Sequence, residues 1–139
     1  MPLLAIGIII ALLIILFAAQ RAGLNAVSGA NSAVKAATAD EAADYLRSFG
    51  WEIFPEPTSI RAAEVPVEFS PAYEDYNAVQ QSQGFDLSGY RGQSVTVYTF
   101  RVLNHTSPNS VFANVMVHGD VVIAGDIVSY AMDGFLTGL

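Results

Sequence analysis

The sequence contains no cysteine and has few basic residues. Of its 139 residues only 6 are Lys or Arg, against 13 Asp or Glu, which gives a formal net charge of −7. The missing cysteine excludes a disulfide scaffold, a thiolate metal site and a cysteine nucleophile. The scarcity of positive charge argues against a nucleic-acid-binding protein, because that function needs a clustered basic surface. Hydrophobic residues make up 53% of the chain, which is too apolar for a disordered protein.

The sequence also lacks the motifs of common catalytic chemistry. It contains no Gly-x-Ser-x-Gly, Ser-x-x-Lys, His-Glu-x-x-His or P-loop pattern. Its two histidines, His105 and His118, do not have the spacing of a metal site, and no calcium-loop pattern occurs. We therefore predict no enzyme activity, no metal and no cofactor.

Polar side chains are absent from Leu3 to Ala19, the longest apolar run. As a helix this run would measure roughly 26 Å, close to the ~30 Å hydrocarbon core of a bilayer. We predict that residues 1–21 form a single transmembrane anchor, with the lipid bilayer as the partner of residues 3–19. A cleaved signal peptide is the alternative. The run is longer than a signal h-region and no basic residue precedes it, although residues 28–30 (SGA) would suit cleavage.

Residues 22–39 are rich in Ala, Ser, Gly and Asn and contain no aromatic residue, which predicts a flexible linker. Arg21 and Lys35 both follow the apolar run, and a literal count of these charges would leave the rest of the chain in the cytoplasm. Two charges are a small bias, so charge alone does not decide the side of the membrane.

Residues 40–139 hold the folding information, because all 13 acids and 14 of the 15 aromatic residues lie there. Thr38 and Glu41 have the spacing of a capping box, which predicts a helix that ends near Gly50. Residues 70–71 (Ser-Pro) predict the start of a second helix, which Gly84 closes.

From Gln93 onward the pattern has a period of two, which predicts strands up to Leu103, over 111–118 and over 121–128. The two-residue loop 119–120 (Gly-Asp) suits a type II′ hairpin. Short strands are expected at 51–54 and, as an edge, at 58–65. The fold class is α+β: a small domain with an antiparallel sheet, built from a C-terminal three-stranded meander and one or two earlier strands, with two helices covering one face.

The stretch 84–92 (GFDLSGYRG) is the most distinctive in the chain. Asp86 is predicted to accept hydrogen bonds from the backbone just after it, as in an Asx turn. Tyr90 would help to hold this loop on the core. Arg91 would pair with an acid such as Asp86 or Asp126.

Gly125 and Asp126 interrupt an otherwise apolar strand. A glycine inside a strand marks a bulge or a close approach of another backbone. A buried acid needs a hydrogen-bond donor, so we predict that Asp126 is a structural anchor bonded to Arg91 or Arg101.

Several stretches taken in order are similar to a known pattern: Phe49–Glu52, Tyr73–Asn77, QGFDLSGYRG at 83–92, Tyr98–Asn104, Ala124–Asp126 and Gly134–Leu139. Together they resemble an uncharacterised domain-of-unknown-function family of small, single-pass membrane-anchored proteins from spore-forming Firmicutes, chiefly clostridia. The resemblance spans roughly residues 46–139. It implies an extracytoplasmic domain, and it assigns no catalytic residue, substrate or cofactor. The candidate structural or interaction residues are Asp86, Tyr90, Arg91, Tyr98, Asn104, Gly125 and Asp126.

These observations favour a non-enzymatic module, tethered to the cell membrane with its domain outside the cytoplasm. It would bind an envelope protein or peptide through a sheet face rich in Tyr and Phe, or through an open edge strand. The alternative is a small cell-wall hydrolase for glycan or peptide that uses a pair of carboxylates. A cation sensor is a third possibility that the negative charge would suit.

Overall fold

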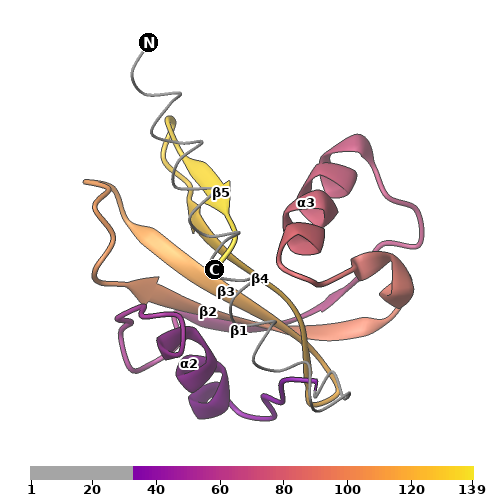
Figure 1. The fold of residues 1–139 in the computed structure, drawn as a ribbon, viewed down its shortest axis with the longest axis horizontal. Coiled ribbons are helices and arrows are strands. Elements are labelled where there is room, and N and C mark those ends of the chain that lie inside the picture. The colour runs from indigo at the N-terminus through magenta and orange to yellow at the C-terminus, as the bar shows by residue number, and fades with distance from the viewer. Residues whose placement is uncertain (1–32) are drawn as a thin grey trace, which may run out of the picture. The chain divides into compact units, whose positions relative to one another are not determined.

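A computed structural model describes residues 33–139, which form an α+β domain with a five-stranded antiparallel sheet and two α-helices (Figure 1). The strand order is β1-β2-β3-β4-β5. The elements are α2 (Ala39–Arg47), β1 (Ser59–Glu64), α3 (Pro71–Ser82), the 3-10 helix η1 (Leu87–Tyr90), β2 (Ser94–Val102), β3 (Val111–His118), β4 (Val121–Ser129) and β5 (Phe135–Thr137). The predicted anchor, residues 1–21, lies outside the described residues. Between residues 33 and 139, no helix has the length and apolar character needed to span a bilayer.

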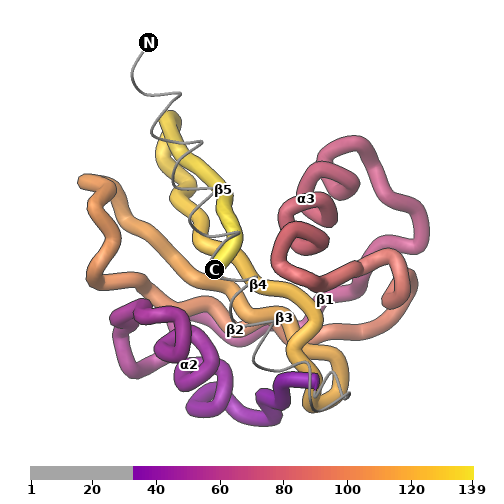
Figure 2. Tube along the Cα trace, in the orientation of Figure 1, coloured from indigo at the N-terminus to yellow at the C-terminus, as the bar shows by residue number. Residues whose placement is uncertain are grey.

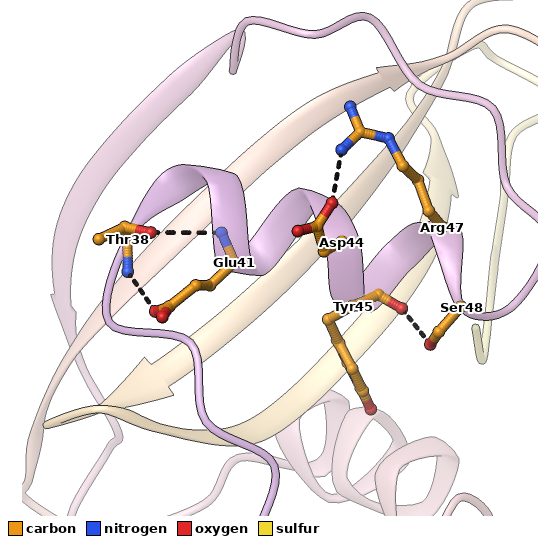
Figure 3. A network of polar contacts seen from close by, with 6 residues as sticks. All are labelled: Thr38, Glu41, Asp44, Tyr45, Arg47 and Ser48. Carbon is orange, nitrogen blue, oxygen red and sulfur yellow. Dashed lines mark hydrogen bonds and ion pairs between the residues drawn. The ribbon is translucent and has the colours of Figure 1, made fainter.

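Helix α2 begins with the predicted capping box (Figure 3). The Thr38 hydroxyl accepts from the Glu41 backbone N–H at 3.3 Å, and the Glu41 carboxylate accepts from the Thr38 backbone N–H at 3.1 Å. These two bonds satisfy N–H groups that have no partner within the helix. At the other end the Ser48 hydroxyl donates to the Tyr45 carbonyl, and the helix stops before Gly50, which has a φ of 89°.

The two helices cover opposite faces of the sheet, so the expectation that both lie on one face is wrong. Leu46 of α2 belongs to the same buried cluster as Phe100 of β2, whereas Tyr76 of α3 belongs to the cluster that contains Val97. Phe100 and Val97 are an odd number of residues apart in one strand and therefore point to opposite faces. Both faces of the central strands are apolar, and each needs a cover.

The β3–β4 hairpin has the predicted two-residue loop. Gly119 has a φ of 62°. Within residues 33–139 only glycines have a positive φ, so the φ of Asp120 is negative. A positive φ at the first loop residue followed by a negative φ at the second is the pattern of a type II′ turn. The pairing then shifts by one residue, because Val117 lies opposite Val122 while Met116 lies opposite Ala124. Ile123 is the extra residue of a β-bulge, and every later residue of β4 changes phase relative to β3. Figure 2 shows this hairpin and the β2–β3 loop at opposite ends of the sheet.

The two outer edges of the sheet differ in whether other backbone pairs with them. Residues 34–36 pair with the start of β4 through the bonds Val122 N–H to Val34 O and Ala36 N–H to Asp120 O, at 2.9 and 2.8 Å. These residues fell inside the predicted flexible linker, yet they are part of the folded unit. On the opposite side, no backbone within residues 33–139 pairs with the outer edge of β1, which is the predicted edge strand.

Two further segments differ from expectation. Residues 51–54 do not form a strand; Ile53 makes a single bridge to Val102, with hydrogen bonds from Leu103 N–H to Glu52 O and from Phe54 N–H to Arg101 O. The nearby prolines remove donors, so the ladder cannot continue. The short strand β5 was not expected, because three residues are too few to show a periodic pattern.

Candidate functional site

An open groove of about 260 Å³ lies on the sheet face that α3 partly covers. Strands β1 to β5 all contribute side chains to it, and α3 supplies one wall. Its polar and tyrosine side chains are Arg61, Tyr73, Tyr76, Asn114, Asp126 and Tyr130. Its apolar side chains are Val97, Met116, Val128 and Leu136. A concave surface that combines apolar area with a few convergent polar groups is typical of a binding site.

The floor of the groove is a continuous row of hydrogen bonds. The Thr99 hydroxyl donates to Asn114 Oδ1 at 2.6 Å, and Asn114 Nδ2 donates to Asp126 Oδ1 at 2.8 Å. The Tyr76 hydroxyl donates to Asp126 Oδ2 at 2.7 Å. Each donor fixes the orientation of the next group, so the row holds Asp126 rigidly.

The sheet register creates this row. Thr99 lies opposite Asn114 in the β2–β3 pair, and Asn114 lies opposite Asp126 in the β3–β4 pair. Residues directly opposite one another on neighbouring strands point to the same face and are close enough to interact. Without the bulge at Ile123, Asn114 would face Gly125 instead.

Helix α3 reaches the row because its first and last turns are both fixed. Ser70 caps its N-terminus by accepting from the Tyr73 N–H at 3.2 Å. Near its C-terminus, Gln80 Oε1 accepts from the Gly125 N–H and Gln83 Nε2 donates to the Gly125 carbonyl, each at 2.9 Å. These side chains bond to a backbone stretch of β4 that β5 leaves unpaired, and they hold Tyr76 over Asp126.

Burial dominates the electrostatics of the groove. Asp126 is only 2% exposed, and the loss of hydration raises the pKa of its carboxyl above the usual value of 3.8, although the Asn114 and Tyr76 hydrogen bonds and the charge of Arg61 act in the opposite direction. Burial also raises the pKa of the Tyr76 hydroxyl, and the Asp126 carboxylate raises it further. Tyr76 is therefore a hydrogen-bond donor at neutral pH and not a source of phenolate.

The groove brings together few kinds of functional group. Among residues 33–139, Asp126 is the only acid that lines the groove, and neither histidine lines it. Across residues 33–139, no group of three His, Asp or Glu side chains is arranged to hold a metal ion. The lining thus offers one carboxylate, one guanidinium, one amide and three tyrosine rings.

The structure gives Asp126 a different partner from the one predicted. Arg91 donates to the Val67 carbonyl at 3.0 Å and stacks over the Phe69 ring at 3.8 Å, so it pairs with neither Asp126 nor Asp86. Arg101 is exposed and makes no bond to Asp126. Asp126 is buried and has hydrogen-bond donors, as expected of a buried acid, but the donors are neutral and come from α3 and β3; its role as a structural anchor stays a prediction.

The other predicted residues lie outside the groove. Asp86 caps η1 by accepting from the Ser88 backbone N–H at 2.9 Å, which confirms the Asx turn, and Tyr90 packs on the core at the end of η1. Tyr98 is buried on the α2 face. Asn104 ties the β2 end to residues 50–52 by accepting from the Glu52 N–H and donating to the Gly50 carbonyl, each at 3.0 Å.

Gly125 lies at a close approach, but its nearest neighbour is the Leu139 side chain and not the second backbone that was predicted. A Cβ at this position would lie 2.5 Å from Leu139 Cδ1 and 3.3 Å from the Asn114 carbonyl oxygen. Its glycine identity lets the C-terminal leucine pack against the strand.

Sequence reasoning missed Tyr76, Asn114 and Arg61 as members of the site. A polar Asn114 within the alternating strand β3 was the available signal, because its neighbours on the same face are apolar. The family comparison covers this region: a family model described as "Domain of unknown function (DUF4830)" matches residues 45–127.

The chain belongs to the DUF4830 family.

The match confirms the predicted resemblance to a domain-of-unknown-function family, and it includes Tyr76, Asn114 and Asp126 but ends before Tyr130. The single-pass architecture and the Firmicutes origin stay predictions. No curated protein and no solved structure matches this DUF4830 chain.

Proposed function

We propose that this DUF4830 domain is a non-catalytic module that binds a peptide segment of an envelope protein in the groove beside α3. The observation that carries the proposal is the groove itself, with apolar and tyrosine walls above a fixed polar floor. Tyrosine and methionine are enriched in protein-binding surfaces. A volume of about 260 Å³ is small for a ligand site and suits one or two residues of a peptide.

A carboxylate-pair hydrolase is less well supported. Such an enzyme needs a second carboxyl within about 5–10 Å of the first, on the other side of the bond to be cleaved. The lining holds Asp126 alone, and its two oxygens already accept from Tyr76 and Asn114.

Leu136 and Leu103 provide a matched test of the groove. Leu136 lines the groove and is 40% exposed, whereas Leu103 is 55% exposed and lies outside it. The full chain is screened against a random heptapeptide library, and the selected peptides are titrated against Leu136→Lys and Leu103→Lys. We expect Leu136→Lys to weaken binding by roughly tenfold or more, as for a central interface residue, and Leu103→Lys to leave it unchanged. A library without binders, or equal binding by both variants, would overturn the proposal.

We also propose that the module works outside the cytoplasm, held by residues 3–19. The apolar run and the architecture implied by the resemblance support this. A fusion of alkaline phosphatase behind Leu139, which is active only outside the cytoplasm, should be active in the membrane fraction. An inactive fusion, or full-length chain in the soluble fraction, would contradict it.

A further inference from the structure

Within residues 33–139, Asp126 is a buried carboxylate that forms no ion pair. Its two hydrogen bonds come from a neutral hydroxyl and a neutral amide, those of Tyr76 and Asn114. The ion pairs within residues 33–139 are Lys35–Asp120 and Arg47–Asp44, and neither involves Asp126. A charge removed from water is normally compensated by a paired opposite charge. The charge of Arg61 acts on Asp126 from a distance and lowers its pKa, but the two groups form no ion pair, so the position for a cation in direct contact with Asp126 is open.

Three tyrosine side chains line the same groove as this carboxylate. Tyr73 and Tyr76 have ring centroids 5.7 Å apart with a 55° tilt, and Tyr130 lines the same groove. The faces of aromatic rings carry negative potential and attract ammonium groups, and a cage of rings beside a carboxylate suits them well. The charge of the domain acts in the same direction, since residues 40–139 carry 13 acidic and 4 basic side chains.

Arg61 adds a positively charged side chain to the groove that also contains the Asp126 carboxylate. It lies on β1, whereas Asp126 lies on β4, three strands away, and both line the groove. Its guanidinium forms no ion pair or hydrogen bond with another side chain of the described residues. Strands are about 4.8 Å apart, so a ligand that contacts both groups must carry its own charges several ångströms apart. An arginine fork is well suited to a carboxylate.

We propose that the groove recognises a primary ammonium group, from a lysine side chain or a peptide amino terminus, placed against Asp126 and the tyrosine rings, with a ligand carboxylate at Arg61. This inference rests on the proposed function, since it names the chemistry of the peptide that the groove takes. The ammonium would add a third, charged donor to the Asp126 oxygens without displacing Tyr76 or Asn114, because each carboxylate oxygen accepts more than one hydrogen bond.

Four small probes test the contributions of the ligand ammonium and the ligand carboxylate to binding. They also distinguish a lysine ammonium from a peptide amino terminus. Nα-acetyl-lysine carries an ε-ammonium and a carboxylate, and alanyl-alanine carries an amino terminus and a carboxylate. Nα,Nε-diacetyl-lysine lacks the ammonium, and Nα-acetyl-lysine amide lacks the carboxylate. Each is titrated into the full chain while the tyrosine ring signals are followed by NMR. We expect at least one of the first two to bind, the diacetyl compound to bind roughly tenfold more weakly, and the amide to bind more weakly than its acid.

Three variants assign these differences to residues. Asp126→Asn should remove the preference for Nα-acetyl-lysine over its diacetyl form, whereas Asp44→Asn, which removes one exposed acid from α2 on the other face, should retain it. Tyr130 is 73% exposed, so Tyr130→Leu leaves the core intact and should weaken ammonium binding severalfold. Arg61→Gln should abolish the difference between the acid and its amide.

The outcomes distinguish this inference from the proposed function. Equal binding of the acetylated and free lysine probes, or an unchanged preference in Asp126→Asn, would overturn the ammonium site. If library peptides still bound in a manner sensitive to Leu136→Lys, the peptide-binding function would stand. If the lysine probe bound with the expected selectivity while the library gave no binder, the ammonium site would stand without it.

Discussion

Replacing Asp126 by Asn tests the electrostatic account of the groove directly. Asparagine has nearly the same shape, keeps one oxygen to accept from Asn114, and offers an amide N–H that the Tyr76 hydroxyl can accept. The change weakens two charge-assisted hydrogen bonds, each worth about 1.5–3 kcal/mol, but it also removes the several kcal/mol that burying the charge costs. We therefore expect Asp126→Asn to change the free energy of unfolding at pH 7 by only about 1 kcal/mol. Asp126→Ala leaves both donors unsatisfied and should cost about 2–4 kcal/mol.

The dependence on pH carries the sharper test. Burial raises the pKa of the Asp126 carboxyl in the folded state above its unfolded value near 3.8, so the folded state holds this proton more tightly. The resulting stabilisation is fully present below the unfolded pKa and is lost as the pH rises through the folded pKa, by about 1.4 kcal/mol for each unit between the two.

The assay is chemical denaturation of the full chain and of Asp126→Asn, both in detergent micelles, from pH 3.5 to 8. The contributions of the other acids cancel when the unfolding free energy of Asp126→Asn is subtracted from that of the wild type. This difference should be most in favour of the wild type at low pH, fall as the pH rises and then level off. Asp44→Asn serves as the control for the loss of one negative charge. A difference that stays constant over this range, or that grows with pH, would refute the claim that burial governs the ionisation of Asp126.

Three further predictions concern the scaffold. The pKa of Asp86 is lowered to about 2, chiefly by the hydrogen bond from the Ser88 hydroxyl, so the stabilisation that Asp86→Asn removes should be present above pH 4 and should shrink towards pH 2 in thermal denaturation. Gly125→Ala should cost about 1–3 kcal/mol, and Leu139→Ala should relieve part of that cost, so that a double-mutant cycle gives less than the sum of the single changes. Thr38→Ala should lower the unfolding free energy by about 0.5–2 kcal/mol, measured by urea denaturation.

Local signals in the sequence predicted the elements well. The capping box at Thr38, the Ser-Pro start of α3 and the Gly-Asp hairpin depend on a few neighbouring residues, and the structure confirms each one. Strand β3 alternates between buried and half-buried residues, as its period of two predicts. These features are set within a few residues, so the sequence contains the information that determines them.

The site was much less predictable, because it depends on register. Residues 121–124 are apolar without alternation, so nothing in them reveals the bulge at Ile123. Counting back from the hairpin loop would place Asn114 opposite Gly125, one residue away from its true partner Asp126. The partner from α3, Tyr76, depends on long-range bonds from glutamines to the backbone of β4, which no local pattern signals.

Within residues 33–139 the outer edge of β1 is unpaired, and this limits how the domain can associate through its sheet. A strand of six residues is long enough to receive one more strand, whereas the far side of the sheet ends in the three residues of β5, and the rest of β4 is closed by residues 34–36 and by α3. Open-ended growth by edge pairing needs two free edges on each molecule. Association of residues 33–139 through this sheet would therefore stop at a single additional strand, giving a complex of two components and not a filament.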